Sequence, residues 1–273
     1  MPSWLISSYR SRILGPAGGV FLIALSALLA SAPAWAQQST ARPLPVLRQE
    51  IDRIDGEILK LLGERTGVVA EVGASKTVAG GPVFRPGRQA SLIKVLIGRS
   101  GGVPSPQAIA AIWTNIIAAS IRTQKPDFTV QVTQDAGPAG YGLAKDFFGA
   151  EIPVTVAGDP ATAFSALVEG RADVVALPLA GGWWRSLPEG VTILASAPLV
   201  RAQPRPDLLI LARQAPDPSG TDMTLVVMPE GDTPGTVLAR EGGEMLVALG
   251  PELPVPLEAR TLGRAAVPVP PGK

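Results

Sequence analysis

An apolar stripe at helical spacing runs from Leu47 to Lys76 and carries two cations. Its members recur at steps of three or four residues, the period of one helix face: Leu47, Ile51, Ile54, Ile58, Leu61, Arg65, Val68, Val72 and Lys76. A charge on a buried face is costly unless an opposite charge meets it. The stripe therefore predicts a long helix whose buried face contains a site for an acid.

The cations of this helix fall into two groups. Arg65 and Lys76 are 11 residues apart, so they lie within roughly 20° of each other and about 16 Å apart along the axis. Both side chains are long enough to converge on a small dianion. Arg48 faces about 100° away from Arg65, so it can reach such a site only from a second chain. A helix about 50 Å long also exceeds a small bundle, and we therefore predict a helical homodimer.

Two shorter helices follow after Gly-Pro breakers. One is expected from about Arg88 to Arg99, and the other runs from Pro106, after the N-cap candidate Ser105, to about Gln124. The first helix itself is expected over about Pro45–Val78. Two polar residues, Ser120 and Gln124, interrupt the buried face of the third helix one turn apart. Arg85 lies in the loop before the second helix, and Arg88 lies at the start of that helix.

Composition narrows the chemistry of the predicted site. The 273 residues are 46% hydrophobic and 17% charged, which indicates a globular protein, and the formal charge of +1 suggests no nucleic-acid partner. The chain has no Cys and no His, so the commonest metal ligands and the commonest general base are absent. We expect no metal and no cofactor. Cations, amides and a hydroxyl suit a reaction that needs orientation and electrostatic preorganisation.

The sequence changes character after Pro126 and becomes rich in Val, Gly and Pro. Alternating strand and helix patterns predict an α/β domain with a largely parallel sheet. The expected strands are 128–132, 153–157, 174–178, 208–213 and 224–228, and the expected helices are 141–148 and 160–169. The domain scheme is a signal peptide (1–36), a linker (37–43), an all-α domain (44–126), an α/β domain (127–250) and an irregular Pro-rich tail (251–273).

The first 36 residues have the pattern of a secretory signal. Arg10 and Arg12 precede the apolar stretch 20–30, and Ala34-Trp35-Ala36 fits the small-residue cleavage rule. Cleavage after Ala36 predicts a periplasmic or secreted protein with no stable membrane association. The alternatives are an uncleaved membrane anchor and, if the start is misassigned, a cytoplasmic protein.

Residues 47–124 resemble the all-helical AroQ-type chorismate mutases. The matching stretches are LRQEIDRIDGEILKLLGER (47–65), VAEVGASK (69–76), PVFRPGRQA (82–90) and IWTNIIAASIRTQ (112–124). The resemblance implies an isomerase of aromatic amino acid biosynthesis that converts chorismate to prephenate by a unimolecular Claisen rearrangement, without covalent or acid–base catalysis.

The resemblance also implies roles for single residues. Arg65 and the partner subunit's Arg48 would hold the two carboxylates, while Lys76 and Gln124 would donate to the ether oxygen as the C–O bond breaks. Ser120 would assist a carboxylate and Arg88 would support the site. Two positions depart from the family pattern: Gln89 stands where many members have Glu, and Arg85 where some have an acidic residue. Both are expected near the substrate hydroxyl, Arg85 through its backbone.

The second domain has a weaker resemblance. Residues 135–141 and 167–178 resemble prephenate dehydratases and periplasmic-type binding proteins, but a Thr-Arg-Phe catalytic signature is missing and the nearest stretch is 204–207. Dehydratase activity is therefore not inferred, and the domain is interpreted as ligand-binding, regulatory or degenerate. Trp183-Trp184-Arg185 is expected either to line a cleft or to dock the two domains.

Two other functions stay open. An isochorismate pyruvate lyase shares the helical fold and the pericyclic type of chemistry. A non-catalytic sensor would bind a small acid in its second domain and use its helices only to dimerise.

Overall fold

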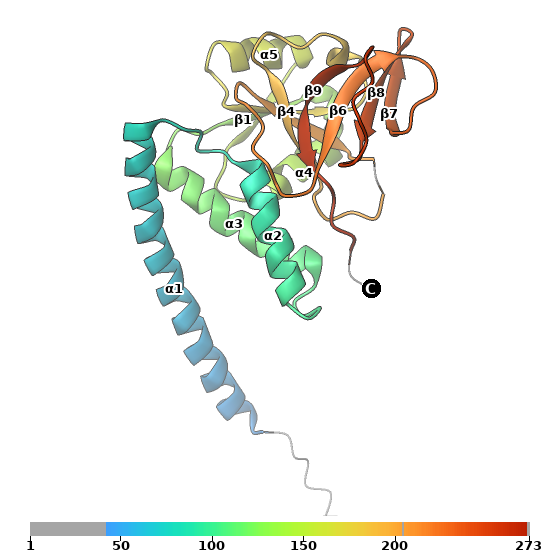
Figure 1. Ribbon diagram of the computed structural model, residues 1–273. Coiled ribbons are helices and arrows are strands. Elements are labelled where there is room, and N and C mark those ends of the chain that lie inside the picture. Colours follow the sequence, from blue (N-terminus) through green and yellow to red (C-terminus); the bar gives the residue numbers. More distant parts are fainter. Residues whose placement is uncertain (1–41, 204, 272–273) are drawn as a thin grey trace, which may run out of the picture. The chain divides into compact units, whose positions relative to one another are not determined.

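The computed structural model describes residues 42–203 and 205–271 (Figure 1). The signal peptide and most of the linker predicted from the sequence lie outside these residues. By their internal contacts the residues form two units, Met1–Ile51 and Asp52–Lys273. The division falls within the 36-residue helix α1 (Leu44–Ala79). Among the described residues no helix is both long and apolar enough to span a membrane.

The face of α1 that the sequence predicts to be buried is exposed to solvent in the single chain. Five apolar members of its stripe in the second unit are between 41% and 62% exposed: Ile54, Ile58, Leu61, Val68 and Val72. Since each is about half exposed, burying the remainder would stabilise the protein by about 1 kcal/mol per side chain. Within residues 42–203 and 205–271 of the single chain, no segment covers this face.

Helices α2 (Pro86–Arg99) and α3 (Pro106–Gln124) confirm the two shorter predicted helices. Ser105 is the N-cap of α3, since its hydroxyl accepts a hydrogen bond from the amide of Ala108 at 3.2 Å. The expected start of α2 at Arg88 is two residues late, because Pro86, whose ring already fixes a helical φ, occupies the first turn. The two helices pack against each other.

The second domain contains a nine-stranded sheet with the order β2-β1-β3-β5-β4-β9-β6-β8-β7. Its elements are β1 (Val130–Thr133), η1 (Gln134–Ala136), α4 (Gly137–Phe148), β2 (Val154–Ala157), α5 (Pro160–Val168), β3 (Val174–Pro178), η2 (Trp183–Arg185), β4 (Thr192–Ala197), β5 (Leu208–Ala212), β6 (Asp222–Pro229), β7 (Thr236–Glu241), β8 (Glu244–Leu249) and β9 (Arg260–Ala266).

The sheet is not largely parallel, as the sequence pattern had suggested. Strand β1 pairs in parallel with β2 and β3, which are connected through α4 and α5. From β3 onward nearly every pairing is antiparallel, with β4 and β9 the exception. The β-α-β pattern describes only the first three strands, because later connections lack crossover helices.

The Pro-rich segment 251–273, expected to be irregular, contains β9, which pairs with β6 from Asp222 opposite Ala266 to Val227 opposite Arg260. Strands β4, β7 and β8 were likewise absent from the sequence-based prediction. Thr192–Ala197 and Glu244–Leu249 are short apolar runs, which periodicity alone does not separate from buried helix or loop.

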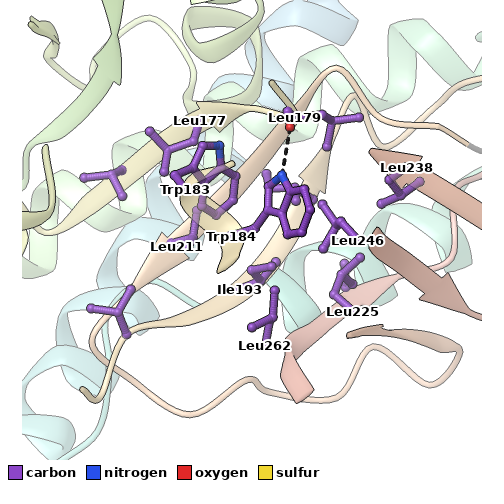
Figure 2. Packing of buried hydrophobic residues seen from close by; sticks show 14 of the residues in the cluster. Leu177, Leu179, Trp183, Trp184, Ile193, Leu211, Leu225, Leu238, Leu246 and Leu262 are labelled. Atoms are coloured by element: carbon purple, nitrogen blue, oxygen red, sulfur yellow. Dashed lines mark hydrogen bonds between the residues drawn. The ribbon is translucent and has the colours of Figure 1, made fainter. Parts of the chain in front are cut away.

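Alternate residues of the central strands face two separate cores. On one side Leu209 and Leu211 of β5 pack with α5 and with both tryptophans of η2; on the other, Leu208 and Ile210 pack with α4. Figure 2 shows Trp183 and Trp184 inside the first core. Their indole Nε1 atoms donate to the carbonyls of Pro178 (2.7 Å) and Leu179 (3.1 Å), so they neither line a cleft nor dock the domains.

The helical domain is joined to the sheet through the second core. Phe84, from the loop between α1 and α2, is 3% exposed and lies 5.9 Å from Phe128 and 5.6 Å from Phe148 between ring centroids. Ala118 and Ile121 of α3 belong to the same cluster. Helices α2 and α3 are therefore anchored on the α/β domain by continuous apolar packing.

Candidate functional site

The contact between Arg65 and Ser120 joins α1 to α3. The Nη1 atom of Arg65 donates to Ser120 Oγ at 2.5 Å and lies 3.5 Å from the carbonyl of Ile116, to which Ser120 Oγ itself donates at 2.8 Å. Burial lowers the pKa of Arg65, because a low-dielectric surrounding disfavours the charged form. The structure thus brings together two of the predicted site residues and places a half-buried cation against the third helix.

Gln124 lies one helical turn beyond Ser120 and adds an unsatisfied polar atom. Its Nε2 donates to the carbonyl of Ser120 at 3.0 Å, whereas its Oε1 is buried and has no hydrogen-bond partner among the described residues. A buried acceptor without a donor costs about 1–3 kcal/mol. A Cβ at Gly73 would lie 3.1 Å from Gln124 Cγ, so the glycine permits the close approach of α1 at this point.

Lys76 lies on α1 beside the loop that leads to α2. Its Nζ donates to the carbonyl of Pro82 at 2.9 Å. Burial lowers the pKa of Lys76, the positive charge of Arg85 lowers it further, and the negative charge of Asp217 acts in the opposite direction. The ammonium is therefore a half-buried donor whose pKa is set by burial and by two charged neighbours.

Arg85 and Arg88 are both exposed, and both are held by Asp217 of the α/β domain. The Nε of Arg85 lies 3.4 Å from Asp217 Oδ2, and the same oxygen accepts a hydrogen bond from the amide of Arg88 at 2.9 Å. Arg85 is the last residue of the loop before α2, and Arg88 belongs to the first turn of that helix.

Gln89 and Arg48 are not joined to the Arg65 contact. Gln89 is buried between α2 and α3, where its Nε2 donates to Thr114 Oγ1 at 3.3 Å. Thr114 and Ser120 are six residues apart, so they face about 120° away from each other on α3. Arg48 is exposed and belongs to the first unit.

A cavity of about 600 Å³ lies on the Gln89 side of α3, between α2, α3, α4 and β4. Its lining is mainly apolar, with Gln89, Gln107, Thr114, Asn115 and Ser196 as neutral polar groups. The charged residues among the described lining are Asp146 and Lys145, and Lys145 donates to the carbonyls of Ala150 and Ile152. A dianion would meet little positive charge here, so the cavity is a poor match for the predicted substrate.

Sequence reasoning missed the residues that hold the loop. Asp217 and Gln214 lie in the connection between β5 and β6, and Gln214 Nε2 donates to the carbonyl of Phe84 at 2.9 Å. Asp217 precedes Pro-Ser-Gly, a pattern typical of a turn. Nothing in that pattern indicates a partner 130 residues earlier in the chain.

The fold and these contacts define a helical domain with two half-buried cations, Arg65 and Lys76, packed onto an α/β sheet domain. Residues 47–125 match the family model of chorismate mutase type II. This segment contains most of α1 and all of α2 and α3, so the helical domain is the part of the chain that is similar to chorismate mutases of that type.

Two known proteins are similar to about half of this chain. The bifunctional chorismate mutase/prephenate dehydratase of Aquifex aeolicus (strain VF5) is 30% identical over 140 residues, which cover 50% of this chain and 38% of the relative. The solved structure of GqqA, described as a novel type of quorum quenching acylase, matches 50% of this chain and 94% of its own, at 17% identity and a TM-score of 0.34. A likeness this small carries no argument about fold or function.

Proposed function

We propose that the helical domain catalyses the rearrangement of chorismate to prephenate. The observation that carries this proposal is the Arg65–Ser120 contact, with the unsatisfied Gln124 amide one turn further along α3. The family match over residues 47–125 and the name of the Aquifex relative support the same reaction. The chain spans 38% of that relative's length, and its dehydratase activity is not proposed here.

In the proposed mechanism the protein supplies only orientation and charge. Arg65, held by Ser120, binds one substrate carboxylate, and Arg48 of a partner subunit binds the other. Lys76 and the Gln124 amide donate to the ether oxygen, which becomes more negative as its bond to carbon breaks while the new C–C bond forms. Donors that interact more strongly with the transition state than with the substrate raise the rate.

The remaining predicted contacts have secondary roles. Arg85 and Arg88 add positive charge at the loop. The amide of Gln89 would reach the substrate hydroxyl only after leaving Thr114, so we expect this contact to contribute least.

The direct test is the loss of chorismate absorbance with the purified protein. Lys76→Ala should lower kcat/KM by about 10²–10³-fold, the usual effect of removing one donor from a developing negative charge. Lys60→Ala is the matched control, since Lys60 lies on the same helix and its side chain is 78% exposed. An unchanged rate for Lys76→Ala would contradict the mechanism. Pyruvate release from isochorismate, measured in parallel, tests the lyase alternative.

We also propose that two chains share each site. Support comes from the exposed stripe of α1 and from the position of Arg48, 17 residues before Arg65 on the same helix. Arg48→Ala and Arg65→Ala chains, each inactive alone, should recover about a quarter of the wild-type activity when mixed, because half of the dimers then hold one intact site. No recovery after confirmed subunit exchange would contradict a shared site.

Export is a separate proposal that rests on the sequence of residues 1–36. A basic start, an apolar stretch and Ala34-Trp35-Ala36 support cleavage after Ala36 and a periplasmic or secreted protein. Fusing residues 1–40 to a reporter that is active only outside the cytoplasm tests this directly. N-terminal sequencing of the exported fusion then separates cleavage from anchoring.

A further inference from the structure

The α/β domain supplies the cap for the first turn of α2. The residue before this helix, Arg85, makes no side-chain cap hydrogen bond, and the first turn contains no acidic residue. Instead Asp217 Oδ1 accepts from the amide of Gly87 at 3.1 Å and Oδ2 accepts from the amide of Arg88 at 2.9 Å. A carboxylate at this place satisfies two of the free amides of a helix start and complements its dipole.

The contact depends on a close approach of two backbones. A Cβ at Gly87 would lie 2.0 Å from the carbonyl oxygen of Asp217, so any larger residue would force the two segments apart. The Asp217 side chain is only 10% exposed. Beside it, Gln214 Nε2 binds the carbonyl of Phe84, and the Phe84 ring is buried in the core of the α/β domain. The segment that carries Arg85 and Arg88, the end of the loop and the first turn of α2, is thus fixed at several points by the second domain.

We propose that Asp217 is a positioning residue for the mutase site: its carboxylate fixes the start of α2 and the guanidinium of Arg85, and thereby sets where the loop presents its charges to Lys76 and to the substrate. This inference rests on the proposed mutase function. It gives the α/β domain a role in building the helical site, in addition to any ligand of its own.

The electrostatic consequence is specific to Lys76. The charged groups facing it are Arg85 in the loop and Asp217 in the second domain, and Glu71 on α1 lines the same shallow hollow. The negative charge of Asp217 raises the pKa of Lys76, against burial and Arg85. Without this charge, Lys76 loses its proton at a lower pH, and a neutral amine is a much weaker donor to the ether oxygen.

The decisive variant is Asp217→Asn, which removes the charge but keeps one acceptor and nearly the same shape. We expect kcat/KM to fall by about 10-fold or more, since small misplacements of site groups have effects up to about 10²-fold. We also expect the alkaline limb of its pH profile to move to lower pH. Asp232→Asn, an exposed loop position in the same domain, is the control for loss of one negative charge and should change neither.

A second variant predicts the opposite shift. Arg85→Gln removes the positive neighbour of Lys76, so its alkaline limb should move to higher pH even though the rate falls. A role of Asp217 in stability alone would not produce limbs that move in opposite directions. If Asp217→Asn kept the wild-type rate and pH profile, or if both variants shifted the limb in the same direction, the proposal would be wrong.

Hydrogen exchange separates this proposal from the proposed function. The amides of Gly87 and Arg88 should exchange faster in Asp217→Ala than in the wild type, while those of β5, Leu208–Ala212, stay protected. This result does not depend on any substrate. A wild-type protein without mutase activity would contradict the proposed function. Unchanged exchange at Gly87 and Arg88 would contradict the anchoring by Asp217 itself.

Discussion

The two halves of the helical domain bury their apolar residues in different ways. Helices α2 and α3 pack on the α/β domain, where Phe84, Ile93, Ala118 and Ile121 are at most 5% exposed. Helix α1 leaves its stripe in solvent, with Leu61 at 62% exposed. The candidate site lies where the two meet, at the contact of Arg65 with Ser120. The α3 side of the site is therefore fixed by packing within this chain. The α1 side carries an exposed apolar surface suited to packing against a second chain.

This comparison predicts that the two halves respond differently to mutation. Changes in the anchored half should alter the free energy of unfolding of the whole domain. Changes on the α1 stripe should alter association and leave the α/β core intact.

The largest effect is expected at Phe84. Phe84→Ala removes a ring that contacts Phe128 and Phe148 in the shared core, and this should lower the free energy of unfolding by about 3–5 kcal/mol. Urea unfolding followed by tryptophan fluorescence measures it, since Trp183 and Trp184 report on the sheet domain. Val78→Ala on α1, at a side chain 91% exposed, should stay within about 0.5 kcal/mol of wild type. Equal losses in both variants would contradict the division.

The next effect is on assembly. Ile58→Asp places a charge in the middle of the exposed stripe, where burial against a second chain would leave the charge without a partner. We expect sedimentation velocity to show a shift toward monomer with an unchanged far-UV spectrum, and a loss of mutase activity. Lys60→Asp is the matched control, because Lys60 points about 160° away from Ile58 on the helix. A wild-type protein that is itself monomeric at micromolar concentration would overturn the role given to α1.

The helices could be predicted from sequence more fully than the sheet. The third helix was expected over Pro106–Gln124 because Ser105, Pro106 and Pro126 mark both ends, and it is observed there. The strands β4, β7, β8 and β9 were missed, because antiparallel strands joined by loops leave no alternation of strand and helix to detect. Trp183 and Trp184 were misinterpreted for a related reason: local sequence does not reveal which face of which strand a loop residue packs on.

The residues of the candidate site also differ in how far the sequence predicts them. Arg65, Ser120 and Gln124 could be placed together because helical periodicity determines which side chains share a face. Asp217 could not be found, since its role depends on the packing of two domains and its partner Gly87 lies 130 residues earlier in the sequence. Gln89 was assigned to the substrate by family resemblance, whereas the structure pairs it with Thr114 on another side of α3.

A smaller effect is expected at Ser120, where the two halves touch. Ser120→Ala removes the hydroxyl that accepts from Arg65, so the guanidinium loses its fixed direction but keeps its charge. We expect kcat/KM to fall by about 10-fold, the equivalent of roughly 1.4 kcal/mol. Thr123→Ala is the control, because Thr123 is exposed on the same helix and its hydroxyl binds only the carbonyl of Ala119. An effect of equal size at Thr123 would indicate a change in helix stability instead of a loss of positioning.

The smallest effect is a dependence of stability on pH from the half-buried lysines of the two halves, Lys76 on α1 and Lys94 on α2. Burial lowers the pKa of both below the ordinary 10.5, and the negative charges of Asp217 near Lys76 and of Asp222 near Lys94 act in the opposite direction. Between the folded pKa and 10.5 the unfolded chain therefore holds more protons than the folded one, and the free energy of unfolding rises with pH in that interval. Lys94→Met should flatten part of this rise, since Met keeps the packing of the stem without a charge, and Lys60→Met should leave it unchanged. Urea titrations at intervals from pH 8 to pH 10.5 measure the slope. If the free energy of unfolding of the wild type fell with pH over this interval, other titrating groups would dominate. The two lysines would then be less desolvated than their half-buried positions imply.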